Sequence, residues 1–270
     1  MTLDEYVGTI RDKRIAVIGA GVSNTPLIEL LLEKGCGVTV RDKRGIDEMG
    51  AEAERLSALG AELRCGEAYL DALDEELIFR TPGLMPFEPH LRAAEAGGAV
   101  VTSEMEAFFA LCPCRSIAVT GSDGKTTTAT IISELLKAAG YTVHLGGNIG
   151  RPLLCEIPRI KKDDYAVLEL SSFQLHSMFC RPDVAVITNI SPNHLDKHRD
   201  YQDYIDAKRA IYKNQRPDAR LVLNYDDAHS DYYRSSAVSR VSFFSDRAEL
   251  SEGVVCKGGA IYRVSGGARA

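Results

Sequence analysis

The chain has 270 residues, of which 45% are hydrophobic and 26% are charged. This length suits two domains, and the balance is that of an ordinary globular protein, which excludes general disorder. The formal net charge of −6 argues against a nucleic-acid-binding protein, because nucleic-acid backbones are bound by basic surfaces.

The cysteines and the apolar runs indicate a compartment. The seven cysteines are irregularly spaced, and Cys112-Pro113-Cys114 is too tight for a C-x-x-C zinc knuckle. Reduced thiols in a cytosolic protein explain this usage. Neither a signal-peptide-like N-terminus nor a run of about 20 apolar residues occurs. We therefore expect a cytoplasmic protein that does not enter a membrane, and we expect it to be monomeric.

The first predicted domain covers residues 1–103. A strand, a glycine turn and a helix recur along it, which is typical of parallel sheets with helical crossovers. A helix at 24–34 ends at Gly35. The predicted strands lie at 14–18, 38–40, 77–80 and 99–102.

The second predicted domain covers residues 104–270 and begins with a short helix at 104–111. Helices are predicted after the loop at 120–127, continuing to residue 139, and at 204–213. The segments 254–256 and 261–264 resemble a hairpin with a glycine turn. Further strands are predicted at 115–120, 142–145, 166–170, 184–189 and 220–224.

The strongest chemical signal is the loop at 120–127. A predicted strand delivers it to a helix N-terminus, where free amides and the helix dipole favour a phosphate. Lys125 can reach the outer phosphates and the Thr126 hydroxyl can bind magnesium. Val119 stands where the strict P-loop pattern has glycine, so this is a shortened variant. The context favours nucleotide binding over a chance match, through Gly121, Ser122, Asp123, Gly124, Lys125, Thr126 and Thr127.

A weaker signal lies in the turn at 19–24, which resembles half of a dinucleotide fingerprint with Asn24 in place of its last glycine. Asp42 lies near the end of the second predicted strand, where an acid can hold a ribose hydroxyl. Alternatives are a turn needed only for packing and an NAD site. Lys43 and Arg44 suit an anionic ligand.

The segment 169–175 follows a predicted strand at its carboxyl end, where parallel sheets bind ligands. Glu169 is placed to hold magnesium, while Ser171 and Gln174 add hydrogen-bonding groups. Alternatively, Ser171 or Ser172 caps the next helix and Glu169 is incidental. Spacing alone does not separate these hypotheses.

Two further candidates have stronger structural alternatives. His194, Asp196 and His198 have a spacing that could bind a metal, although a lone histidine is usually structural or on the surface. Lys208 falls at the edge of a helical apolar stripe, where a lysine ordinarily extends its amine to solvent.

Taken in order, these motifs resemble the Mur ligase family. The TGSDGKTT loop is shared by Mur ligases and folylpolyglutamate synthases. The segments GAGVSN, GGNIG at 146–150 and ELSSFQL are more similar to the members that add D-glutamate to UDP-N-acetylmuramoyl-L-alanine. The similarity covers essentially the whole chain.

The resemblance implies a Rossmann-like first domain that holds the UDP-substrate and a central P-loop-type parallel-sheet domain that binds ATP. It places one magnesium ion on Thr126 and Glu169 and a second on His194 and Lys208, with Lys208 carboxylated. Asn148, Ser171, Gln174 and His194 would contact substrate, phosphate or metal. The uridine and diphosphate contacts would be Val22, Ser23, Asp42, Lys43, Arg44 and Gly83.

The implied reaction belongs to peptidoglycan precursor synthesis. The alanyl carboxylate attacks the γ-phosphorus of ATP, Lys125 and magnesium neutralise the developing charge, and the D-glutamate amine attacks the acyl phosphate. The catalytic residues would be Lys125, Asn148, Glu169, His194 and Lys208. Asn193 stands where some members carry aspartate, which puts an acid role there in doubt.

The family's C-terminal Rossmann-like domain is expected to be absent, so we expect no turnover by this chain alone. Another ligase of the superfamily is disfavoured because it would have no use for the first domain. A non-catalytic UDP-sugar-binding fragment stays open, and an NAD-dependent dehydrogenase is disfavoured by the GKTT loop.

Overall fold

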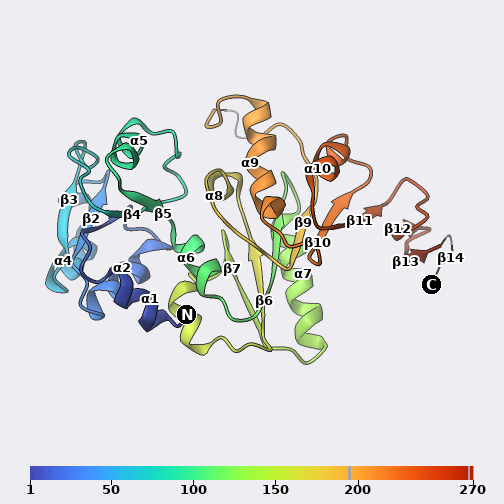
Figure 1. The fold of residues 1–270 in the computed structure, drawn as a ribbon, viewed down its shortest axis with the longest axis horizontal. Coiled ribbons are helices and arrows are strands. Elements are labelled where there is room, and N and C mark those ends of the chain that lie inside the picture. Colours follow the sequence, from blue (N-terminus) through green and yellow to red (C-terminus); the bar gives the residue numbers. More distant parts are fainter. Residues whose placement is uncertain (194–195, 267, 270) are drawn as a thin grey trace. The chain divides into compact units, whose positions relative to one another are not determined.

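The computed structural model describes residues 1–193, 196–266 and 268–269. The chain forms two compact units, each with its own sheet (Figure 1). Unit 1 comprises Met1–Pro113 and Gly150–Lys161, and unit 2 comprises Cys114–Ile149 and Lys162–Ala270. None of the helices in the described part of the chain has both the length and the apolar character needed to cross a membrane.

The sheet of unit 1 has five strands in the order β3-β2-β1-β4-β5, and all its pairs are parallel. This arrangement confirms the predicted Rossmann-like topology. The chain moves outward from β1 in one direction and then returns to its other side, so a switch point lies between β1 and β4. The bounds are β1 Ile15–Ile18, β2 Val38–Asp42, β3 Glu62–Cys65, β4 Leu77–Phe79 and β5 Val100–Thr102.

Helices pack on both faces of this sheet. Leu91 and Ala94 of α5 join Ala16, Ile18 and Ile78 in one apolar cluster. The buried α2 residues Leu27, Ile28 and Leu31 belong to a helix that contacts β1 and β2. Parallel strands covered on both faces are uniformly apolar, as Ile15–Ile18 is. The helices of unit 1 are α1 Leu3–Ile10, α2 Asn24–Glu33, α3 Ile46–Met49, α4 Ala51–Ala58, α5 Pro89–Ala96, α6 Glu104–Leu111 and the 3-10 helix η1 Leu154–Arg159.

The boundary between the units differs from the expected division at residues 103 and 104. The helix α6 belongs to unit 1, and 150–161 returns to the same unit from the middle of the second sheet. The physical reason is a local contact: the buried carboxylate of Glu104 accepts a hydrogen bond from the Leu154 N–H at 2.8 Å. Phe108 and Leu111 bury their side chains on the same helix.

The sheet of unit 2 has nine strands in the order β14-β13-β12-β11-β10-β9-β6-β8-β7. Pairs from β7 to β12 are parallel, and the predicted hairpin is confirmed by the antiparallel pairing of β12 with β13. The bounds are β6 Arg115–Thr120, β7 Val143–Gly147, β8 Tyr165–Glu169, β9 Val184–Ile187, β10 Arg220–Asn224, β11 Arg240–Ser245, β12 Gly253–Lys257, β13 Ala260–Ser265 and β14 Ala268–Arg269.

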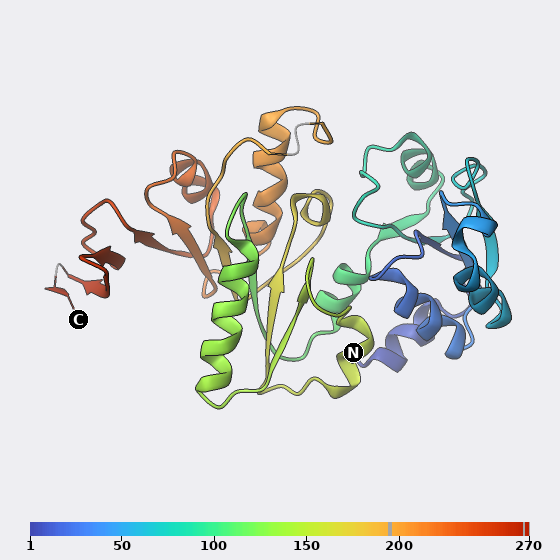
Figure 2. The same ribbon diagram turned by 180° about the vertical axis from the view of Figure 1, so that it is seen from behind.

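Figures 1 and 2 show α7 and α9 on opposite faces of this sheet. The α7 residues Ala129, Ile132 and Leu136 pack against Val119 and Val167. Because neighbouring strand residues face opposite sides, Ala118 and Thr120 point toward the α9 face. The helices of unit 2 are α7 Lys125–Ala138, α8 Ser172–Leu175, α9 Tyr201–Lys213 and α10 Ser230–Ser236. Strand β11 and helix α10 were not predicted, whereas α8 is the helix of the capping alternative for Ser171.

Candidate functional site

The predicted phosphate loop lies between the carboxyl end of β6 and the first turn of α7, as expected. Gly124 has a φ of 75° and precedes the helix in the left-handed conformation, which glycine adopts at little cost. Gly121 has a φ of 148°, and a Cβ there would lie 1.9 Å from Thr188 Oγ1. The loop therefore requires glycine at both positions, one for conformation and one also for space.

Side chains after β9 hold this loop in shape. Thr188 Oγ1 donates to the Asp123 carbonyl at 2.7 Å, and Asn189 Nδ2 donates to the same carbonyl at 3.0 Å. Asn189 Oδ1 in turn accepts the Asp123 N–H at 3.0 Å. The buried Ser122 hydroxyl donates to the Ser191 carbonyl and lies 2.8 Å from the Tyr204 hydroxyl. Thr188 and Asn189 were not predicted to belong to the site, although a Thr-Asn pair at the end of a buried strand was an available signal.

The magnesium candidates Thr126 and Glu169 lie together. Thr126 Oγ1 donates to Glu169 Oε2 at 2.6 Å, across the gap between α7 and β8. Asn148 Nδ2 donates to Glu169 Oε1 at 2.9 Å, so the carboxylate is held from both sides. The Glu169 residue is 2% exposed. At the start of α7, Lys125 Nζ donates to the Ser122 carbonyl at 2.7 Å. Two neighbouring side chains therefore hold the Glu169 carboxylate. Its oxygens and the Thr126 hydroxyl are of the oxygen-ligand type that magnesium prefers.

Asn148 reaches this carboxylate because β7 lies next to β8. The Asn148 N–H donates to the Glu169 carbonyl at 2.7 Å. Gly147 has a φ of 95°, and a Cβ there would lie 2.1 Å from the same carbonyl. Backbone contacts with Glu169 thus hold the GGNIG segment in place. They position the Asn148 side chain next to the end of β8.

Ser171 and Gln174 lie at the same sheet edge and also cap α8. Ser171 Oγ accepts the Gln174 N–H at 3.2 Å, and Gln174 Oε1 accepts the Ser171 N–H at 3.0 Å. This reciprocal pair is a capping box. The capping alternative is therefore correct for Ser171. Because Ser171 comes just after β8, it still lies at the carboxyl edge of the sheet.

Lys208 is 1% exposed, which contradicts the alternative of a lysine extending to solvent. Its Nζ donates to the Gly121 carbonyl at 3.1 Å and lies 4.3 Å from the centroid of the Tyr204 ring. Burial, with a smaller contribution from the Lys125 charge, lowers the Lys208 pKa to about 7. The predicted partner His194 lies outside the described residues.

The predicted UDP-binding residues of unit 1 surround the carboxyl ends of β1, β2 and β4. A pocket of about 380 Å³ lies there, at the switch point of the sheet. Val22 is 82% exposed beside the turn, and Ser23 precedes α2 without capping it. The pocket lining is Ile18, Gly19, Ala20, Gly21, Asp42, Lys43, Arg44, Tyr69, Thr81, Gly83 and Leu84.

Asp42 organises this pocket from below. Its carboxylate accepts the Ala20 N–H at 2.8 Å and the Arg44 N–H at 2.9 Å, joining the turn after β1 to the end of β2. Arg44 Nη2 also contacts Asp42 at 2.9 Å and Glu52 at 3.2 Å. Burial raises the pKa of Asp42, but the Arg44 and Ala20 hydrogen bonds hold this pKa below its usual range. Asp42 is therefore an anion that fixes the turn and Arg44.

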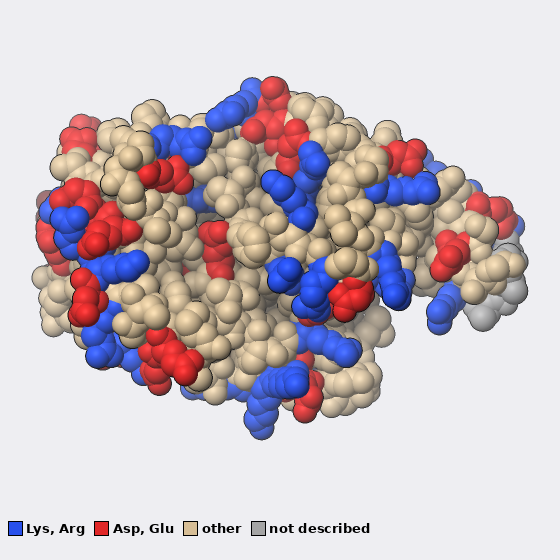
Figure 3. Space-filling model, viewed as in Figure 1, with Lys and Arg blue, Asp and Glu red and all other residues tan. Residues whose placement is uncertain are grey.

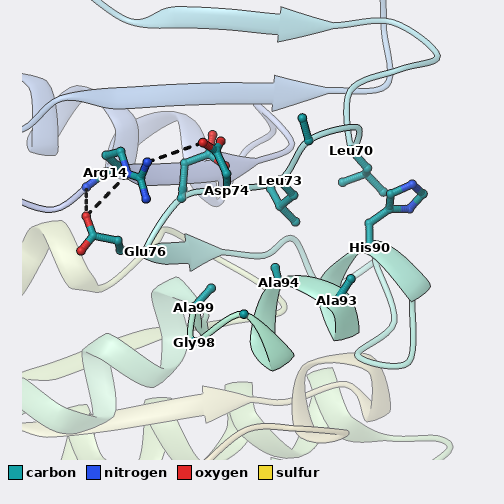
Figure 4. Close-up of a pocket in the computed structure, with 13 residues that line it drawn as sticks. Arg14, Leu70, Leu73, Asp74, Glu76, His90, Ala93, Ala94, Gly98 and Ala99 are labelled. Carbon is teal, nitrogen blue, oxygen red and sulfur yellow. Dashed lines mark hydrogen bonds and ion pairs between the residues drawn. The ribbon is translucent and has the colours of Figure 1, made fainter.

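A larger pocket of about 640 Å³ lies at the amino ends of β1, β4 and β5 (Figure 4). Arg14 points toward Asp74 and Glu76 within it, with its Nη1 3.5 Å from Asp74 Oδ2. It contains none of the predicted site residues, and parallel sheets bind ligands at the opposite edge. On the molecular face in Figure 3, basic and acidic side chains are interspersed.

Comparisons with known proteins agree with this geometry. Residues 119–259 match the family model described as the Mur ligase middle domain. The chain is 45% identical to "UDP-N-acetylmuramoylalanine--D-glutamate ligase" of Acetivibrio thermocellus over 256 residues, which are 94% of this chain and 55% of that protein. It is 46% identical to the protein of the same name from Clostridium tetani over 251 residues, covering 93% of this chain and 55% of that protein.

Solved structures show the same fold at low sequence identity. One is the UDP-N-acetylmuramate:L-alanyl-gamma-D-glutamyl-meso-diaminopimelate ligase of Neisseria meningitides, with a TM-score of 0.58 and 19% identity over 96% of this chain and 86% of that one. Another is the UDP-N-acetylmuramate-alanine ligase of Thermotoga maritima, with a TM-score of 0.51 and 17% identity over 90% of this chain and 54% of that one. The chain spans about half the length of the first sequence relatives.

Proposed function

Because the chain belongs to the Mur ligase family, we propose that it takes part in the ATP-dependent addition of D-glutamate to UDP-N-acetylmuramoyl-L-alanine. Unit 1 would bind the UDP-substrate, and unit 2 would bind ATP with magnesium. The proposed reaction is a step of cytoplasmic peptidoglycan precursor synthesis, and the proposed protein is a monomer. The similarity to D-glutamate ligases at 45–46% identity supports this substrate over a folate-type ligase.

The observation that carries the proposal is the pair of hydrogen bonds that holds the Glu169 carboxylate. Its carboxylate lies between the Thr126 hydroxyl and the Asn148 amide at the edge where the phosphate loop ends. A magnesium ion held by Thr126 and Glu169 would neutralise charge on the transferred phosphoryl group. Lys125 begins α7 and would turn from the Ser122 carbonyl toward the outer phosphates of ATP.

The reaction needs a carboxylate and a phosphorus atom held in line, with charge neutralised around both. The alanyl carboxylate would attack the γ-phosphorus of ATP, and ADP would leave. The amine of D-glutamate would attack the resulting acyl phosphate, and phosphate would leave. Asn148 would orient the acyl group from β7, while Ser171 and Gln174 would contact the substrate from the end of β8. A protein nucleophile is not required.

Lys208 would support the second magnesium site, together with His194, after its amine has reacted with carbon dioxide. The ammonium group first loses one proton to give the neutral amine. The amine nitrogen then bonds to the carbon of carbon dioxide, one C=O π bond becomes a carboxylate, and a second proton leaves, so a cation becomes a carbamate anion. A lysine pKa of about 7 supports it, because the neutral amine is the nucleophile. Protein supplied with ¹³C-bicarbonate should show a carbamate signal by NMR that Lys208→Met loses and Lys213→Met, on the exposed part of α9, retains. A signal unchanged in Lys208→Met would exclude this role.

Unit 1 would hold the uridine and the diphosphate over the turn after β1. Arg44 and Lys43 supply positive charge, and the backbone at Gly21 and Gly83 allows close approach. Val22 and Ser23 would contact the ligand from the exposed rim of the turn. A second candidate, UDP-sugar binding without catalysis, rests on this pocket alone and requires no nucleotide in unit 2.

Thermal unfolding with ligands tests the proposal. ADP with magnesium should raise the midpoint temperature, because a ligand that binds only the native state adds about 2.7 kcal/mol to the free energy of unfolding at 100 times its Kd. Lys125→Ala should remove this shift. Lys137→Ala is the matched control, because Lys137 lies on the same helix and pairs with Glu134 at the surface.

The outcomes separate the two candidate functions. A shift with UDP-N-acetylmuramoyl-L-alanine and none with ADP and magnesium would favour the non-catalytic UDP-sugar binder. A nucleotide shift retained in Lys125→Ala would remove the phosphate loop from the proposed site.

A further inference from the structure

A cluster of two histidines and one aspartate lies beside α8 and the first turn of α9. Asp203 accepts contacts from both rings: His176 Nε2 is 2.9 Å from Oδ1, and His198 Nδ1 is 3.0 Å from Oδ2. The candidate ligand atoms all lie within 4.8 Å of one another. The residues come from three segments, so the cluster exists only in the folded chain.

We propose that His176, His198 and Asp203 bind a divalent transition-metal ion of the zinc class, separate from the magnesium site of the phosphate loop. Two imidazoles and one carboxylate are a ligand set that zinc uses, with water in the fourth position. Imidazole nitrogen favours zinc over magnesium, whereas Thr126 and Glu169 offer only oxygen. The two sites therefore differ in both position and metal preference.

The surroundings of the cluster fit a metal site. The Ser172 hydroxyl lies 3.0 Å from His198 Nε2 and can accept its proton, which leaves Nδ1 as the coordinating atom. The His198 ring stacks with Phe173 at 5.5 Å and with His176 at 5.7 Å between ring centroids, and these contacts hold its position. The backbone N–H of Arg199 donates to Asp203 Oδ2 and orients the carboxylate.

Exposure and spacing decide how an ion would enter. The His198 side chain is fully buried, while those of His176 and Asp203 are 15% and 16% exposed, so solvent reaches the cluster from their side. Ligands about 2.0–2.1 Å from zinc lie about 3.3 Å apart in a tetrahedron. The two histidine–carboxylate distances are 2.9 and 3.0 Å, a few tenths of an ångström less, while the candidate ligand atoms as a set lie within 4.8 Å of one another. The His176 ring, inclined by 24° to that of His198, would turn to direct its lone pair to the same point.

A bound ion would fasten α8 to the start of α9, the helix that carries Tyr204 and Lys208. Its role would be to hold this helix against the sheet. None of the three ligands takes part in the contacts of Thr126, Glu169 or Lys125. Zinc uptake can be measured without nucleotide or UDP-substrate, so the zinc proposal and the ligase proposal can each fail alone.

Competition with a chromophoric chelator tests the site. The metal-stripped chain should take up one zinc ion in the presence of excess magnesium. His176→Gln and Asp203→Asn should each weaken binding at least about tenfold, the smallest loss seen even for outer-shell partners. His144→Gln is the matched control, since it removes another histidine–aspartate contact, His144 Nε2 to Asp164 Oδ2 at 2.9 Å, and should leave zinc affinity unchanged.

Cobalt substitution supplies a readout that does not depend on affinity. Cobalt should give the intense visible absorption of a four-coordinate site in the wild type and lose it in His176→Gln. Zinc uptake that is equal in the wild type, His176→Gln and Asp203→Asn would overturn the proposal. The proposal would also be overturned if His194→Ala lost zinc uptake while His176→Gln kept it, because the ion would then be bound elsewhere.

Discussion

Gly121 shows at the scale of one residue how the phosphate loop depends on close packing. Its φ of 148° and the missing side chain let Thr188 and Asn189 approach the loop backbone. The same neighbours hold Asp123 through three hydrogen bonds. The packing of Thr188 and Asn189 against the loop backbone therefore leaves no room for a side chain at Gly121 and also fixes the conformation of the loop.

Gly121→Ala should abolish stabilisation by ADP and magnesium and also lower the intrinsic stability. The new Cβ would lie 1.9 Å from Thr188 Oγ1 and 3.1 Å from the Asn189 carbonyl, so overpacking of about 1–3 kcal/mol adds to the conformational cost. Gly140→Ala is the control: its φ is 89°, but nothing lies within 4 Å of a Cβ there. Urea unfolding with and without nucleotide measures both effects. Equal losses in the two variants would show that the contact with Thr188 is unimportant.

At the scale of elements, α6 and η1 are joined through a buried carboxylate. Burial raises the pKa of Glu104 to about 7, although hydrogen bonds from the Leu154 and Leu153 backbones act in the opposite direction. The native state therefore keeps a proton between pH 4.5 and about 7 that the unfolded chain has lost. The free energy of unfolding then falls as pH rises through this window, by at most about 1.4 kcal/mol per pH unit.

Glu104→Gln should flatten this pH dependence, because an amide has no proton to lose. The variant should gain stability relative to the wild type on going from pH 5 to pH 8, as measured by urea unfolding. Glu156→Gln, which alters a carboxylate of η1 paired with Arg159, should follow the wild-type profile. A Glu104→Gln profile parallel to that of the wild type would assign the pH dependence to other groups.

At the scale of the whole molecule, each unit has its own parallel sheet and its own candidate ligand edge. The pocket lined by Asp42 and Arg44, the proposed UDP site, lies at the carboxyl ends of β1, β2 and β4, and the phosphate loop lies at the carboxyl end of β6. Ligands of open parallel sheets bind at such edges. We expect the two sites to respond separately to mutation.

Arg44→Ala should weaken binding of UDP-N-acetylmuramoyl-L-alanine at least about tenfold, the effect of 1.4 kcal/mol, and leave the ADP–magnesium shift intact. The change removes a cation from the pocket and frees the Asp42 carboxylate that it contacts. Calorimetric titration of both ligands provides the measurement. Arg64→Ala, which alters an exposed pair with Glu62 on β3, should bind both ligands normally. Loss of ADP–magnesium binding in Arg44→Ala would show that the two sites are coupled.

Elements that depend on short-range signals could be predicted from the sequence. Apolar runs ending in glycine predicted the parallel strands, and β6, α6 and β10 have the predicted bounds. The phosphate loop was equally local, since strand, glycine and helix start lie within ten residues. Helices α3 and α4 and strand β11 were missed because polar, short or weakly periodic segments acquire their structure from packing.

Only the tertiary structure decided contacts between distant residues. Glu169 meets Thr126 from 43 residues away, and Lys208 is buried beneath Gly121 from 87 residues away. Arg41 shows the same limit: it is fully buried and donates five hydrogen bonds, two to the Glu75 carboxylate and three to backbone carbonyls at 69–72. Periodicity shows which face of an element is apolar, but not which distant polar group that face contacts in the folded chain. That depends on the sheet order, which brings separate strand ends to one edge.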